Sequence, residues 1–144
     1  MKDTGMTTES SLNKLLKWVE NPDWISNLNI KNVSAILDER DDESFSMRWM
    51  EAFRSIEEKK ITLHAQNENL VLKIREIVYL QIFNCWKSPD LAAYVSDDFG
   101  LIGDALLLDS SDSWINGLFQ AYVLHNIPVG NFEKIEGKLS DLVL

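Results

Sequence analysis

The amino-acid sequence predicts an all-α fold: a single compact bundle of about six to eight short antiparallel helices around a central apolar helix. Three observations lead to this prediction. The 144 residues suit one domain, 1–144, of which residues 1–7 are expected to form a loose N-terminus. Apolar residues recur three and four positions apart, which is the helical spacing. Hydrophobic residues make up 45% and charged residues 26% of the chain, a composition typical of globular proteins and not of disordered ones.

Four amphipathic segments are predicted in the first sixty or so residues. The first helix follows from the spacing of Leu12, Leu15, Leu16 and Val19. A proline suits the first turn of a helix, so Pro22 predicts a second helix, which carries Trp24, Ile25 and Leu28. A third short helix is indicated by Val33, Ile36 and Leu37. After a charged connection at 38–43, a fourth helix is predicted by the stripe of Phe45, Trp49, Phe53 and Ile56.

Residues 68–87 form the most apolar segment of the chain. Its apolar residues cover nearly every face of a helix, and they include Leu70, Val71, Leu72, Ile74, Ile77, Val78, Leu80, Ile82, Phe83 and Trp86. A helix that is apolar all round belongs at the centre of a bundle, so we expect this one to be the central helix. The β-branched residues in the segment leave a strand as the alternative.

The second half of the chain begins with a strong helix-start signal. Ser88-Pro89-Asp90 combines an N-cap serine, a proline at the first helical position and an acid in the first turn. Ser96-Asp97-Asp98 is expected to cap a further helix that ends near Leu108. Beyond a polar turn, another helix is indicated by Trp114, Ile115, Leu118, Phe119, Tyr122 and Val123, and a short final segment spans 132–144.

Catalytic and metal-binding motifs are not evident in the sequence. There is no P-loop, GxSxG or CxxC, so we expect no enzyme activity, no cofactor and no metal site. His64 and Glu68 stand four residues apart, as metal ligands can, but two ligands do not complete a site. The single cysteine, Cys85, lies in an apolar run and is expected to be buried. The absence of a signal peptide and of a long apolar segment predicts a cytoplasmic protein.

Acidic residues dominate the stretch from residue 88 to residue 130, in a chain whose formal net charge is −9. The stretch holds no Lys or Arg, and its acids are Asp90, Asp97, Asp98, Asp104, Asp109 and Asp112. We predict that Asp97, Asp98, Asp104, Asp109 and Asp112 form one acidic rim, unneutralised by any nearby base, that attracts a basic partner. Tyr94 or Trp114 would be an exposed anchor within this rim. Helix capping for the aspartates and a core position for Trp114 are the simpler structural alternative.

The same stretch carries a family resemblance. Residues 88–108 (SPDLAAYVSDDFGLIGDALLL), followed by Trp114-Ile115-Asn116, resemble segments of helical immunity proteins from bacterial contact-dependent growth-inhibition systems, which are toxin–immunity pairs. The similarity covers residues 70–128. It implies a protein that binds and neutralises a cognate toxin domain with a basic surface, often a nuclease, inside the producing cell.

Two other functions remain open at this point. A helical adaptor would bind a protein partner, other than a toxin, through an apolar groove. A small enzyme or metal protein would use the carboxylates together with His64. The acidic net charge argues against nucleic acid as a partner, and no segment predicts a membrane partner. The oligomeric state does not follow from the sequence.

Overall fold

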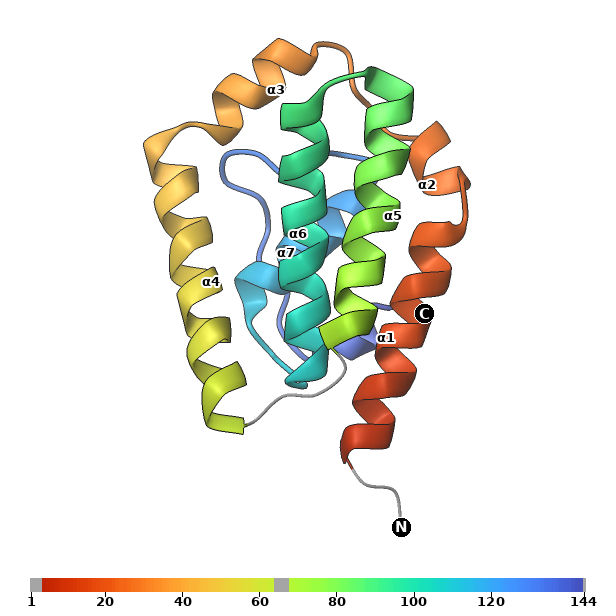
Figure 1. Ribbon diagram of the computed structural model, residues 1–144. Coiled ribbons are helices and arrows are strands. Elements are labelled where there is room, and N and C mark those ends of the chain that lie inside the picture. The colour runs from red at the N-terminus through yellow and green to blue at the C-terminus, as the bar shows by residue number, and fades with distance from the viewer. Residues whose placement is uncertain (1–3, 64–67, 144) are drawn as a thin grey trace.

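The computed structural model describes residues 4–63 and 68–143, and this part of the chain folds entirely into helices and connecting segments. Figure 1 shows the arrangement of the seven α-helices and one short 3₁₀ helix. They are α1 (Thr4–Glu20), α2 (Asp23–Ser26), α3 (Val33–Arg40), α4 (Glu43–Leu63), α5 (Glu68–Trp86), α6 (Pro89–Leu107), α7 (Ser113–Val123) and η1 (Leu139–Asp141). The predicted all-α fold is confirmed.

The central helix is α6, and not the segment 68–87 that the sequence favoured. α6 is buried along most of its length and packs against α1, α3, α4, α5 and α7 (Figure 1). α5 lies alongside it but leaves Leu72 and Leu80 at least half exposed. The prediction was wrong because an apolar residue on every face of α5 does not require every face to be covered.

The start of α6 follows the sequence signal, whereas its predicted interruption does not occur. The Ser88 hydroxyl accepts a hydrogen bond from the Leu91 amide at 3.1 Å, and Pro89 lies in the first turn. The helix then continues through Ser96-Asp97-Asp98 without a break. The Ser96 hydroxyl donates to the Arg75 carbonyl of α5 at 3.0 Å, so it joins two helices instead of capping a new one.

Aromatic residues from four helices form the centre of the core. The ring of Phe99 in α6 lies 5.2 Å from that of Trp24 and 4.9 Å from that of Tyr122, and Trp18 and Phe119 also pack against it. The Trp24 indole donates a hydrogen bond to the Val19 carbonyl at 2.9 Å, so its polar atom is satisfied. This cluster joins α1, α2 and α7 to the central helix.

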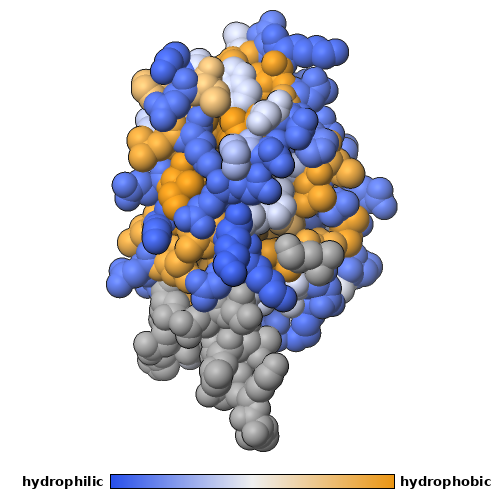
Figure 2. Space-filling model, turned by 90° about the vertical axis from the view of Figure 1, so that its right-hand side faces the viewer, coloured by the Kyte–Doolittle hydropathy of each residue, from blue (hydrophilic) through white to orange (hydrophobic). Residues whose placement is uncertain are grey.

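Cys85 is exposed, whereas the sequence predicted that it is buried. The segment around it is apolar, but Cys85 lines an open hollow between α5 and α2, together with Ile25 and Trp86. Figure 2 looks onto the side of the molecule that carries α1 and α2, where hydrophilic residues interrupt the hydrophobic ones. None of the helices in the described part of the chain is long and apolar enough to cross a membrane.

The segment after α7 packs back onto that helix. The side-chain amide of Asn116 donates to the carbonyls of Ile135 and Gly137 at 2.9 and 2.7 Å. Gly117 allows the close approach, because a Cβ atom there would lie 2.3 Å from the Glu133 carbonyl oxygen. The final segment is therefore held against α7 through a position that has no side chain.

We expect Gly117→Ala to lower the free energy of unfolding by about 1–3 kcal/mol, because the added methyl group overpacks a contact with backbone. Urea denaturation followed by circular dichroism measures the change. Gly103→Ala is the matched control, since its Cβ would meet only the Val71 side chain, at 3.2 Å, and a gain in helix propensity of about 1 kcal/mol offsets the contact. Equal stabilities for the two variants would contradict the described packing.

Candidate functional site

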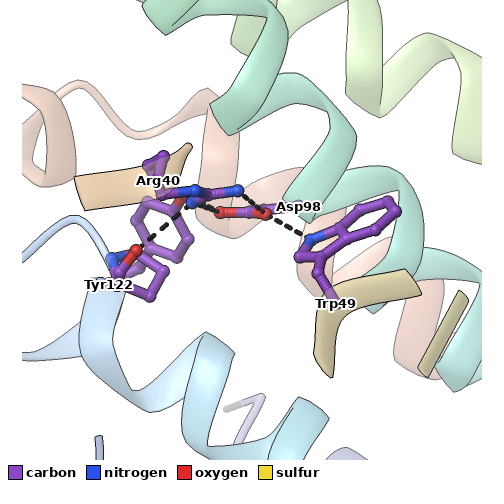
Figure 3. A network of polar contacts seen from close by, with 5 residues as sticks. Arg40, Trp49, Asp98 and Tyr122 are labelled. Carbon is purple, nitrogen blue, oxygen red and sulfur yellow. Dashed lines mark hydrogen bonds and ion pairs between the residues drawn. The ribbon is translucent and has the colours of Figure 1, made fainter. Parts of the chain in front are cut away.

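Asp98 is a fully buried carboxylate at the centre of a network of polar contacts (Figure 3). Two of its hydrogen bonds come from the Arg40 guanidinium, at 2.7 and 2.8 Å. The Trp49 indole N–H donates a third at 2.9 Å, and the Tyr122 hydroxyl donates a fourth at 2.5 Å. Asp98 in α6 is thereby connected to α3, α4 and α7.

Arg40, the last residue of α3, is buried with its charge fully paired. It also donates to the Pro128 carbonyl at 3.3 Å, and its guanidinium lies over the rings of Phe45 and Tyr94. Burial alone would lower the pKa of Arg40, but the charge of Asp98 and the hydrogen bonds to it raise the pKa above its ordinary value. Burial, together with the charge of Asp98, also raises the pKa of Tyr122. Arg40 therefore stays charged and Tyr122 stays a neutral donor.

The inward direction of Arg40 leaves a purely acidic surface at the junction of α3 and α4. Residues 38–43 contain one base, Arg40, and that base is buried. The other five side chains are exposed carboxylates, which we call the acidic corner: Asp38, Glu39, Asp41, Asp42 and Glu43. The corner adjoins α6, because the Tyr94 hydroxyl donates a hydrogen bond to Asp41.

An open groove runs from the acidic corner between α4 and α6 and reaches the first turns of α5; we call it the α4–α6 groove. It consists of two adjoining hollows of about 260 and 550 Å³, both lined by Trp49, Met50 and Asp97. The rings of Trp49 and Phe53 stack at 5.5 Å on the α4 side. Leu72 of α5 lies across from them and is 57% exposed. This part of the lining is thus apolar and partly open to solvent.

Ion pairs line the α6 side of the α4–α6 groove. Asp97 pairs with Arg75 at 2.8 Å. Asp104 pairs at 3.1 Å with Lys60, whose ammonium also meets Glu57 at 3.1 Å and Glu68 at 2.7 Å. The pKa of both aspartates lies above its ordinary value, mainly because of burial, although their basic partners lower it. Both carboxylates are therefore partly removed from water. At Lys60, one base faces three acids.

The prediction of an unneutralised acidic rim was wrong for most of its members. Asp98 is buried on Arg40 and cannot contact a partner from the folded protein. The bases that meet Asp97, Asp104 and Asp109 are Arg75, Lys60 and Lys138, respectively. Asp112 caps α7, accepting hydrogen bonds from the Trp114 and Ile115 amides at 2.9 and 3.0 Å. These bases lie outside residues 88–130, so the local charge count did not include them.

The two aromatic residues predicted as anchors differ in position. Tyr94 is half-buried at the end of the α4–α6 groove that lies next to the acidic corner. Trp114 is only 6% exposed and packs between Phe45 and Phe132, with Arg48 over its ring, so it belongs to the core.

Three of the predicted site residues, Tyr94, Asp97 and Asp104, therefore share the α4–α6 groove. Asp109, Asp112 and Trp114 lie outside it. The residues that the sequence reasoning missed are Arg40, Trp49, Met50 and Phe53 on the opposite side of the groove. One signal was available, because Arg40 is the single base in a run of acids. His64 lies outside the described residues, and no group of metal-ligating side chains occurs within them.

Comparison with known families assigns the chain to a group of immunity proteins. The family model described as Immunity protein PIM1 matches residues 14–129, which include the whole α4–α6 groove and its buried Asp98. The chain belongs to this family. The match confirms the resemblance to immunity proteins drawn from residues 70–128 and extends it to most of the chain. Among curated proteins, no match to the chain was found.

We expect Asp98→Asn to lower the free energy of unfolding by about 3–5 kcal/mol, because it leaves the buried Arg40 charge without a counter-ion. The neighbouring Asp97→Asn is the matched control. It breaks a half-exposed pair and should cost no more than about 1 kcal/mol. Urea denaturation of both variants provides the comparison. Similar losses in the two variants would show that the Asp98 network does not hold α3 and α4 in place.

Proposed function

We propose that this protein binds a cognate toxin domain and neutralises it inside the cell that produces both. The observation that supports this most strongly is the immunity-family match over residues 14–129. Neutralisation by occlusion requires a complementary surface and no chemistry, so we propose an inhibitor without catalytic activity. Contact-dependent growth inhibition is the proposed biological setting, and the cytoplasm is the proposed location.

We further propose that the toxin presents a basic surface, as a nuclease does where it binds phosphate. The net charge of −9 and the acidic corner support this choice. An acidic surface steers a basic partner during diffusion and raises the association rate. Tyr94, Asp97 and Asp104 stay in the proposed contact surface, whereas Asp98, Asp112 and Trp114 serve the fold.

Co-expression with the toxin tests the function. For an immunity protein we expect the adjacent gene to encode a protein with a C-terminal toxin domain, and this domain, expressed from an inducible promoter, is the probe. Cells that also carry this protein should survive induction, and purified protein added at a 1:1 ratio should abolish the toxin's activity in vitro. Cell death at the rate seen with an empty vector would refute the proposal and favour an adaptor without a toxin partner.

The electrostatic part of the proposal predicts a change in association rate. At low salt, Asp38→Asn combined with Glu39→Gln should slow association with the toxin domain by about 3–10-fold, because steering by the acidic corner weakens. Glu20→Gln with Asp23→Asn is the control of equal charge change on the α1–α2 side of the molecule (Figure 1). Stopped-flow measurements at several salt concentrations give the rates. Equal rates for the two double variants would remove the acidic corner from the proposal.

A further inference from the structure

We infer that the α4–α6 groove is the docking site for a protruding segment of the toxin that carries an apolar anchor residue and at least one Arg or Lys. This inference rests on the proposed function and specifies which part of each partner makes contact. In this mode of recognition, the side chains of a single helix or strand fill a groove on the partner.

The distribution of exposed apolar side chains supports the α4–α6 groove. Six large hydrophobic residues are markedly exposed among the described side chains: Met47, Met50, Ile61, Leu72, Leu80 and Leu124. The first three lie on α4, and two of the six, Met50 of α4 and Leu72 of α5, line the groove itself. Exposed apolar side chains that gather in one place mark interaction sites. Methionine suits such a surface because its flexible side chain adapts to the partner.

The packing of α4 explains why this region is open. α4 contacts α3 and α6 as its main helical neighbours, whereas α5 and α6 pack together along their whole length. Figure 1 shows α4 at one side of the molecule, with its neighbours on one face only. The Trp49 indole is fixed by its hydrogen bond to Asp98, and Phe53 stacks on it. A partner would therefore meet a preformed apolar surface, which reduces the entropy lost on binding.

Charge determines the chemistry of the occupant. Four carboxylates line the larger hollow against only two cations, Lys60 and Arg75. The excess of negative charge is greatest around Lys60, because its single positive charge is shared by Glu57, Glu68 and Asp104. At the other end, the groove adjoins the acidic corner through Asp41. A cationic side chain is favoured at either end, and a second copy of this acidic chain is disfavoured by like-charge repulsion.

Substitution of Leu72 tests both the location and the charge of the occupant. The probe is the purified toxin domain from the adjacent gene, made inactive, and the measurement is its Kd for each variant by calorimetry. Leu72→Arg should weaken binding by at least about tenfold, because it adds both bulk and repulsion against a basic segment. Leu72→Glu should weaken binding less, since its charge attracts that segment. Leu80→Arg is the control on the same helix, at a residue 50% exposed outside the groove, and should change Kd less than twofold.

Each result leads to a definite conclusion. If Leu72→Arg binds as Leu80→Arg does, the groove is not the docking site, while protection by the unaltered protein would leave the proposed function intact. If Leu72→Glu binds more weakly than Leu72→Arg, the occupant is not basic and the inference fails. If the unaltered protein does not bind the probe, both the inference and the proposed function fail. Met50→Arg, on the opposite wall, repeats the test should Leu72→Arg alter the thermal unfolding of the protein.

Discussion

The charge of Asp98 is the constraint on which the arrangement of the helices depends. A carboxylate with no solvent contact is tolerated only when donors surround it, and here they come from Arg40, Trp49 and Tyr122. A buried ion pair is not a large net source of stability, because desolvation opposes the attraction. What it supplies here is position: α3, α4 and α7 each have to place one donor side chain at a single point on α6. The path of α4, and with it the shape of the α4–α6 groove, follows from that requirement.

The same network also shapes the candidate surface from beneath. Arg40 is drawn inward, so the charged run at the α3–α4 junction presents acids alone to solvent. Trp49 turns its N–H toward Asp98, and its ring then stacks with Phe53 in the lining of the groove. One buried interaction therefore governs both the charge and the apolar character of the surface above it.

The core and the proposed contact surface draw mainly on different helices. α1, α5, α6 and α7 bury most of the apolar residues and supply the core. α4 contributes Phe45, Ala52 and Ile56 to that core, but keeps a second, exposed face with methionines and charges. Such an arrangement suits the proposed docking at the α4–α6 groove, because the exposed face of α4 can contact a partner without a change in the packing of the core.

The sequence by itself predicted most of the helices, because their signals are local: apolar spacing and the Ser88-Pro89 start of α6. It also indicated the immunity family. Only the tertiary structure decided how the charges pair, since Asp98 and Arg40 stand 58 residues apart, and Asp104 and Lys60 stand 44 apart. No periodicity in the sequence relates such distant positions. The charge count along residues 88–130 therefore predicted an unneutralised acidic rim, whereas folding brings a base to most of these carboxylates. Likewise, helical spacing predicts that Leu72 lies on a helix. Which side of that helix stays exposed depends on how the other helices pack against it.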